Sequence, residues 1–69
     1  MALQRYRITT QTADRAESTR VILPDLPSAE TQAREIAVRE KGTRVRVYFE
    51  RYGEEKAREL VLDLGPGSG

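Results

Sequence analysis

Alternating apolar and polar residues in the stretches 43–52 and 57–64 predict the two strands of a β-hairpin. A period of two is the pattern of a strand with one buried face. The predicted inner residues of this hairpin are Val45, Val47, Phe49, Leu60, Leu62 and Leu64. The segment 53–56 between the strands has one glycine and three charged residues, which suits a short loop. We therefore expect the second half of the chain to supply much of the core.

The register of this hairpin follows from keeping its apolar residues together. With the loop centred on its two glutamates, Phe49 faces Leu60 and the apolar residues share one face. We expect Phe49, Leu60 and Leu62 to be nearly inaccessible to solvent. The same register sets Glu50 against Glu59, which is an unfavourable pair of like charges. A shift of two residues removes that pair, so two even registers stay open.

A second pair of strands is predicted in the first third of the chain. Residues 3–11 alternate, with Tyr6 and Ile8 on the inner face. Residues 19–23 form the next strand, which ends at Pro24 because proline cannot donate a hydrogen bond to a ladder. The polar segment between these strands has no periodicity and is expected to be a loop.

A helix is expected from Ala29 to about Lys41. Ser28 is the best candidate for the N-cap, and Gly42 stands where a left-handed C-terminal cap is expected. Leu26 is expected to close one end of the core. The apolar face of this helix consists of Ala29, Ala33, Ile36 and Ala37. Because this face is mostly alanine, the helix can lie close to a sheet but buries little apolar area.

These elements predict a single small α+β domain over residues 1–64, with one four-stranded sheet and the helix on one face. The layout resembles the β-grasp architecture of ubiquitin-like domains, which implies the strand order 2-1-4-3. The stretch 19–42 also has the ubiquitin-like succession of strand, Pro-Ser, helix and glycine. No ubiquitin function is carried over, because Pro66 interrupts the glycines that conjugation would need. Residues 65–69 are expected to form a flexible Gly/Pro/Ser tail.

Composition removes most enzyme chemistry. The 69 residues include no cysteine and no histidine, so disulfides, the commonest metal ligand and the usual nucleophile–base pairs are missing. We expect a protein that is not an enzyme, with no cofactor, no metal site and no small-molecule substrate. The lack of cysteine fits a reducing cytoplasm. No apolar run approaches the roughly 20 residues of a membrane span, so we expect a cytoplasmic protein without a membrane partner.

Charge gives only a weak indication of a partner. Twelve basic and eleven acidic residues leave a net charge of +1, which disfavours a strongly electrostatic nucleic-acid binder. Since only Lys41 and Lys56 are lysines, ten of the twelve basic residues are arginines. Arginine favours recognition of phosphate or carboxylate, although coding bias is the simpler explanation of this enrichment.

The sheet face that points away from the helix is the candidate binding site. The residues predicted to lie there are Arg5, Arg7, Arg20, Ile22, Arg44, Arg46, Tyr48 and Val61. Arginine, tyrosine and exposed apolar side chains are typical anchors of protein interfaces, and arginine beside an aromatic ring can stack single-stranded bases. The plain alternative is that Arg46 pairs with Asp63, the other arginines are solvated, and the apolar residues are ordinary exposed positions.

The sequence therefore predicts a non-enzymatic binding or structural module that contacts a protein partner, or a second copy of itself, through this face. A two-fold dimer could instead form by edge pairing, which Arg20 and Pro24 would oppose. A nucleic-acid-binding accessory domain is the first alternative. The size and element order also resemble very small phage-encoded inhibitors of host defence, including anti-CRISPR proteins, and that resemblance implies an inhibitor. A chain designed only to fold is a further alternative.

Overall fold

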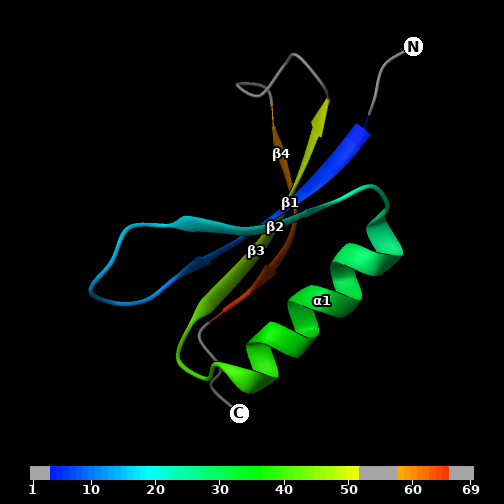
Figure 1. Ribbon diagram of the computed structural model, residues 1–69. Helices are drawn as coiled ribbons and strands as arrows, with labels where there is room; N and C mark the ends of the chain where they lie inside the picture. Colours follow the sequence, from blue (N-terminus) through cyan, green and yellow to red (C-terminus); the bar gives the residue numbers. More distant parts are fainter. Residues whose placement is uncertain (1–3, 52–57, 66–69) are drawn as a thin grey trace.

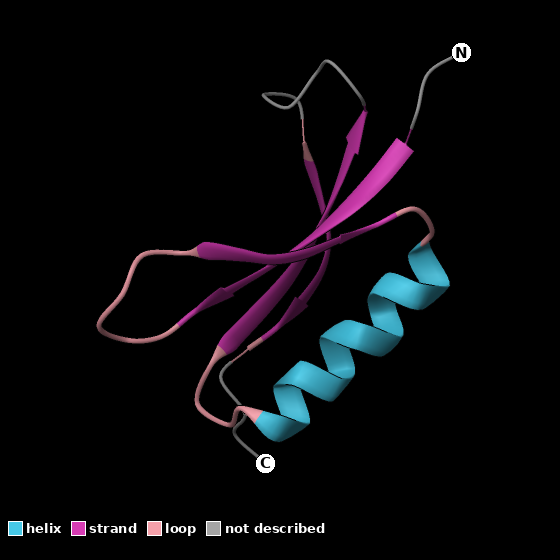
Figure 2. Ribbon diagram, in the orientation of Figure 1, coloured by secondary structure: helices cyan, strands magenta, loops and turns pink. Residues whose placement is uncertain are grey.

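Strands and helix follow one another in the order that the sequence pattern predicts. In the computed structural model, which describes residues 4–51 and 58–65, these elements are β1 (Gln4–Gln11), β2 (Ser18–Leu23), α1 (Leu26–Arg39), β3 (Arg44–Arg51) and β4 (Glu59–Leu64). The strands form one antiparallel sheet, and α1 crosses one of its faces (Figure 1, Figure 2). The expected α+β class, with one sheet and one helix, is confirmed. The predicted loop 53–56 and residues 66–69 of the predicted tail lie outside the described residues.

The strand order is β2-β1-β3-β4, so the β-grasp order 2-1-4-3 is wrong. β1 pairs with β3 along its whole length, from Gln4 to Gln11. Both strands have eight residues, whereas β4 has six, so β3 satisfies more of the backbone of β1 than β4 could. The pairing also sets Arg5 opposite Glu50, which is a favourable cross-strand pair. Because β2 and β3 are both antiparallel to β1, they run parallel, and α1 is the connection that crosses over β1.

The core lies between the sheet and α1 and is centred on the two inner strands. Its buried hydrophobic residues are Ile8, Ala29, Ala33, Ile36, Val45 and Val47. Partly buried residues that pack around it are Tyr6, Val21, Leu23, Ala37, Leu62 and Leu64. The predicted inner faces of β1 and α1 are therefore confirmed. Leu26, which was expected to close one end, is partly buried at the start of α1 and is not part of this cluster.

The helix begins earlier than expected, and Ser28 is not its N-cap. The cap is Asp25, whose Oδ2 accepts a hydrogen bond from the Ser28 backbone N–H at 3.0 Å. Pro27 is tolerated inside the first turn because the N–H groups of that turn have no acceptor within the helix. The helix also ends earlier than expected, at Arg39, and its C-cap is Glu40 and not Gly42. Gly42 has the expected left-handed conformation, with φ +87, in the turn that the Thr43 N–H closes on the Glu40 carbonyl; glycine adopts this conformation without steric cost.

A β-bulge in β4 changes the predicted hairpin register. Three predicted pairs are present: Val45 with Leu64, Arg46 with Asp63, and Val47 with Leu62. Beyond them the pairing slips, so that Leu60 lies opposite Tyr48 and Val61 is the extra residue. The pairing therefore shifts by one residue at this point, although alternation favours one register for the whole strand. It sets Glu59 opposite Phe49 and removes the like-charged pair that the original register contained.

The predicted near-complete burial of Phe49, Leu60 and Leu62 is wrong, and the slip accounts for Leu60. Leu60 is 47% exposed, because its position opposite Tyr48 puts it on the face away from α1. Phe49 and Leu62 are only partly buried. The Phe49 ring contacts Tyr6, with 5.4 Å between ring centroids, and is not part of the buried cluster beneath α1.

The other edge strand, β2, is bulged as well. Ile8 pairs with Val21 but Thr9 pairs with Thr19, which leaves Arg20 as the extra residue. The Arg20 guanidinium donates two hydrogen bonds, of 2.9 and 2.6 Å, to Glu40 at the end of α1. Arg20 therefore joins an edge strand to the helix. Both edge strands of the sheet are short and bulged, which are two ways in which proteins oppose edge-to-edge pairing.

Substitution of one core residue, and of Leu60 beside the bulge, should separate the two faces of the sheet. We expect Ile8→Ala, which removes a fully buried side chain, to lower the free energy of unfolding by about 2–5 kcal/mol. Leu60→Ala should change it by only about 0.5 kcal/mol, as for an exposed site. Urea denaturation of both variants measures these differences. Equal losses would show that Leu60 is part of the core and that β4 is not bulged.

Candidate interaction surface

The face of the sheet opposite α1, called here the outer face, arranges its side chains in rows across the strands. The central row consists of Ile22 on β2, Arg7 on β1, Tyr48 on β3 and Leu60 on β4. On one side of it lie Arg5 and Glu50, and on the other side Thr9, Arg46 and Asp63. Each row consists of residues that the strand pairing sets opposite one another. The order of the strands in the sheet therefore determines the order of the side chains across the outer face.

The most buried polar group on the outer face is the carboxylate of Glu50, which is 1% exposed. Arg7 binds it at two points: Nε donates to Oε2 at 2.7 Å and Nη2 donates to Oε1 at 3.2 Å. Arg5 donates from Nε to Oε1 at 3.0 Å. Hydrogen bonds from Arg7, opposed by burial and helped by Arg5, hold the pKa of Glu50 below its ordinary value. The carboxylate therefore stays ionised and fixes both arginines.

A second carboxylate, that of Glu17, reaches across the outer face from the residue before β2. Its Oε2 accepts hydrogen bonds from Thr9 Oγ1 at 2.7 Å, Tyr48 Oη at 3.0 Å and Arg46 Nη1 at 3.3 Å. Burial raises the pKa of Glu17, but the bonds from Thr9, Tyr48 and Arg46 outweigh it, so the pKa lies below its ordinary value. One side chain thus links residues of both central strands to the start of β2.

Asp63 holds the remaining arginines of this face. Its Oδ2 accepts a hydrogen bond from Arg44 Nη1 at 3.2 Å and lies 3.8 Å from Arg46 Nε. The predicted pair of Arg46 and Asp63 is therefore present. The alternative that the other arginines are only solvated is wrong, because Arg5, Arg7 and Arg44 each contact a carboxylate.

Exposed hydrophobic residues flank this network. Among the described residues, four large hydrophobic side chains are exposed. Ile22 at 42% and Leu60 at 47% lie on the outer face, and Val61 at 41% is the bulge residue next to Leu60. Ile22 lies on one edge strand, whereas Leu60 and Val61 lie on the other, next to Tyr48. The Arg58 guanidinium covers the Tyr48 ring at 4.9 Å from its centroid. The face thus combines apolar residues at its two edges with arginine and tyrosine at its centre.

The pairing places six of the eight predicted site residues on one face. These are Arg5, Arg7, Ile22, Arg44, Arg46 and Tyr48, and Val61 is the unpaired bulge residue beside them. Arg20 is the exception, since the bulge in β2 and its bonds to Glu40 direct it to the helix. Sequence reasoning missed Glu17, Glu50, Leu60 and Arg58. The like-charged pair of Glu50 and Glu59 was the one signal that the simple register would not hold.

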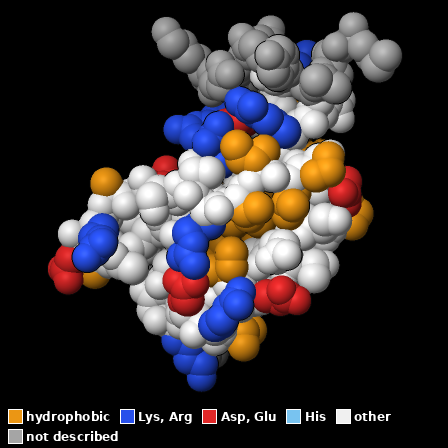
Figure 3. Space-filling model, in the orientation of Figure 1, with side chains coloured by type: hydrophobic (Ala, Val, Ile, Leu, Met, Phe, Trp, Pro, Cys, Tyr) orange, Lys and Arg blue, Asp and Glu red, His pale blue; other side chains and the backbone are white. Residues whose placement is uncertain are grey.

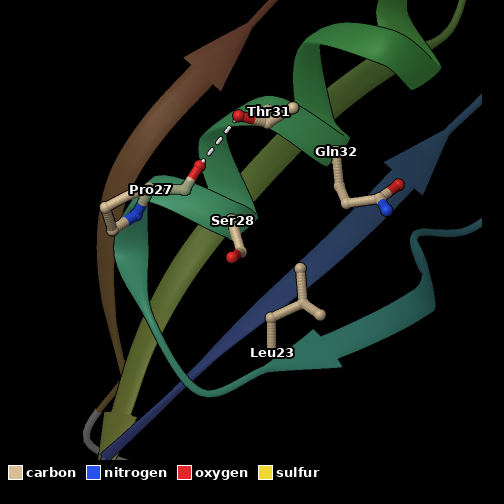
Figure 4. A pocket seen from close by; sticks show the side chains of 5 residues that line it. All are labelled: Leu23, Pro27, Ser28, Thr31 and Gln32. Atoms are coloured by element: carbon tan, nitrogen blue, oxygen red, sulfur yellow. Dashed lines mark hydrogen bonds between the residues drawn. The ribbon is translucent and has the colours of Figure 1, made fainter.

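A groove lies between β2 and α1, away from the outer face. It has a volume of about 420 Å³ and is lined by Leu23, Pro27, Ser28, Thr31 and Gln32 (Figure 4). Figure 3 shows hydrophobic side chains gathered in the middle of this view, where β2 and α1 lie side by side. Thr31 Oγ1 donates to the Pro27 carbonyl at 3.0 Å. The lining has no charged group, so the groove offers a ligand little to fix its orientation.

Comparison with known proteins found no matching family model, no matching curated protein and no matching solved structure. Within residues 4–51 and 58–65, no group of three or more histidine, cysteine or acidic side chains could hold a metal ion. In the same ranges, no helix has the length and apolar character needed to cross a membrane.

The buried carboxylate should give the protein a specific acid sensitivity. We expect Glu50→Gln to lower the free energy of unfolding at pH 7 by about 1.5–3 kcal/mol, the range for hydrogen bonds to charged groups. Because the pKa of Glu50 is lowered by folding, its stabilising contribution is present above the ordinary value of 4.5 and is lost as the pH falls through the folded pKa. The difference between parent and variant should therefore shrink from pH 7 towards pH 2.

Urea unfolding across this pH range measures the difference. Glu59→Gln, which removes a charge from an exposed residue of β4, is the control and should show no comparable pH-dependent change. A difference for Glu50→Gln that stays constant with pH would contradict the assignment of an ionised, arginine-bound carboxylate.

Proposed function

We propose that the protein is a non-enzymatic protein-binding module and that the outer face of its sheet is the interface. The observation that carries this proposal is the position of the exposed hydrophobic residues. Ile22 and Leu60 lie on the one face that α1 leaves uncovered, and the exposed bulge residue Val61 is next to Leu60. The bulge in β4 moves Leu60 to that face, where an ordinary register would have buried it.

The polar part of the face supports the same proposal. Tyrosine and arginine are the residues most enriched among interface anchors, and the central row contains one of each, Tyr48 and Arg7. Arg7 is already held at two points by Glu50. A side chain that is ordered before binding loses less conformational entropy in the complex, so the network favours affinity by preorganisation.

The two edges of the sheet are less suitable for binding a partner. β2 carries a bulge at Arg20 and β4 carries one at Val61. A bulge interrupts the regular spacing of donors and acceptors that an added strand would need. We therefore infer binding through the face and not by addition of a strand.

Binding of nucleic acid receives less support than binding of protein. Three carboxylates, those of Glu17, Glu50 and Asp63, lie among the arginines of the outer face. A phosphate would have to replace one of these bonded carboxylates or lie beside it, at a cost in repulsion. Any such binding would weaken steeply with salt, because each phosphate contact releases counterions.

Capture from a lysate with matched variants tests the proposal. We expect proteins retained by the immobilised parent to be lost from Leu60→Glu, which puts a charge on the outer face, and to be kept by Val38→Glu. Val38 is the control because it is 72% exposed on α1, away from the outer face. The capture should survive nuclease and change little with moderate salt.

Two results would contradict the proposal. Equal retention by the parent and Leu60→Glu would show that the outer face is not the interface. Loss of all retention after nuclease treatment would favour the nucleic-acid alternative. A thermal melt of each variant, monitored by circular dichroism, confirms that it is folded before capture is compared.

A further inference from the structure

Three donor groups on the outer face converge on one carboxylate oxygen, the Oε2 of Glu17. They are the Thr9 hydroxyl at 2.7 Å, the Tyr48 hydroxyl at 3.0 Å and the Arg46 guanidinium at 3.3 Å. We propose that these donors form a binding site for an aspartate or glutamate side chain of a partner protein, and that Glu17 occupies the site when the partner is absent. The inference rests on the proposed function, since it names what the outer face recognises.

The three donors belong to the two central strands of the sheet. Thr9 lies on β1, Arg46 and Tyr48 lie on β3, and the two strands pair along the whole length of β1. Arg46 Nε lies 3.8 Å from Asp63, and the Arg58 guanidinium covers the Tyr48 ring, so both side chains have a further contact besides the bound carboxylate. Donors that are ordered before binding lose less conformational entropy when a ligand arrives.

Glu17 itself lies outside the strand pairing. The last pair of β1 with β2 is Thr10 with Ser18, so Glu17 belongs to the connection between these strands, of which residues 12–16 are exposed. Its second oxygen, Oε1, accepts no hydrogen bond within the described part of the chain, so only half of the acceptor capacity of this carboxylate is used. The carboxylate can therefore leave the donors together with the connection, without breaking a pair of the sheet.

The charges around the site favour a ligand with a single negative charge. Arg44 and Arg46 both contact Asp63, so two guanidinium groups stand against one carboxylate once Glu17 has left. One incoming carboxylate restores the balance that Glu17 provides. A phosphate monoester carries a charge of about −1.5 to −2 at pH 7, which would leave an excess of negative charge beside Asp63, at a cost in repulsion. The site is thus suited to an acidic side chain.

Apolar groups beside the site indicate what should accompany this acidic side chain. Leu60 lies opposite Tyr48 and is 47% exposed, and the exposed bulge residue Val61 is next to it. Because Arg58 covers the Tyr48 ring, the hydroxyl is the part of this tyrosine that a ligand contacts. A segment that places its carboxylate on the three donors can set an apolar side chain against Leu60 and Val61. The ligand is accordingly an acidic residue with an apolar neighbour.

Occupation by Glu17 lowers the affinity of the parent protein for such a ligand. The apparent Kd equals the intrinsic Kd divided by the fraction of molecules in which the site is open. Removal of the Glu17 side chain opens the site in every molecule. If Glu17 fills the site in about nine-tenths of the molecules or more, Glu17→Ala gains at least about tenfold in affinity.

Titration of isotope-labelled protein with a peptide, followed by NMR, measures both the affinity and the release of Glu17. The probe is an acetylated and amidated peptide with one glutamate next to two leucines. We expect Glu17→Ala to bind it at least about tenfold more tightly than the parent does. In the parent, the amide signals of residues 12–17 should shift, because the peptide expels the Glu17 carboxylate. Glu35→Ala, which removes an exposed carboxylate from α1, is the control and should bind the peptide as the parent does.

Further variants and two altered peptides test the donors and the class of ligand. Tyr48→Phe, added to Glu17→Ala, removes one hydrogen bond to a charged group and should weaken binding about tenfold or more. A peptide with glutamine in place of glutamate should likewise bind at least about tenfold more weakly, and one with phosphoserine should bind no more tightly than the glutamate peptide. Glu17→Gln, which removes the charge of Glu17, repeats the comparison, so the result does not depend on the folding of one variant.

Three results would overturn the inference. Equal binding of the glutamate and glutamine peptides to the folded variants, or no binding of either, shows that the donors are not a carboxylate site. Binding to Glu17→Ala with none to the parent, at a peptide concentration about fifty times the Kd of the variant, shows that Glu17 is a fixed structural contact. Tighter binding of the phosphoserine peptide makes phosphate the ligand. In each case the proposed function still stands if capture from the lysate depends on Leu60.

Discussion

The pairing of β1 with β3, with one buried carboxylate at its outer surface, is the constraint on which the rest of the structure depends. Glu50 is 1% exposed, and it is stable there only because Arg5 and Arg7 bind it from the neighbouring strand. An isolated buried charge would cost several kcal/mol or lose its ionisation. Any strand order that separated β1 from β3 would leave Glu50 without these partners. The ionic contacts of the outer face and the topology of the sheet therefore depend on each other.

The inner and outer faces of the sheet are stabilised by different physical means. On the inner face, alanines of α1 approach closely over Ile8, Val45 and Val47, and stability there comes from burial and close packing. On the outer face, Glu17, Glu50 and Asp63 join the arginines across the strands. Each exposed ion pair contributes little alone, but a connected network also restricts the side chains that take part in it.

The periodicity of the sequence was sufficient to predict the strands, the helix and their buried faces. It was not sufficient to predict which strands lie next to each other in the sheet. Alternation placed Val45 and Val47 inside, and helical spacing placed Ala29 and Ala33 inside, because both depend only on local geometry. Strand order is a non-local property, so the pattern could not show that β3 lies beside β1. The buried state of Glu50 was missed for the same reason, since its partners come from a strand that the expected order placed elsewhere.

The bulge in β4 shows a second limit of prediction from sequence periodicity. The leucines of the stretch 57–64 alternate without a fault, yet Leu60 lies on the outer face because pairing slips at Val61. A bulge leaves no mark on periodicity when the residues on both sides of it are apolar. The helix start was missed because Asp25 and Ser28 are both good caps, and only the position of the first turn decides between them. Arg5, Arg7, Arg44, Arg46 and Tyr48 of the candidate surface were therefore predicted, whereas its carboxylates, Arg58 and Leu60 were not, and Arg20 was wrongly included.

The central strand pair has a further consequence for how the chain reaches its fold. The contact between Arg5 and Glu50 joins residues 45 positions apart, whereas each hairpin is closed locally. A two-stranded hairpin is marginal on its own in water, so neither half of the chain has a stable sheet until the two hairpins meet. Folding therefore requires contacts between residues far apart in the sequence, and a high contact order lowers the folding rate. The halves are consequently one cooperative unit, and the chain cannot be divided within the connection from β2 to β3 without losing the structure of both.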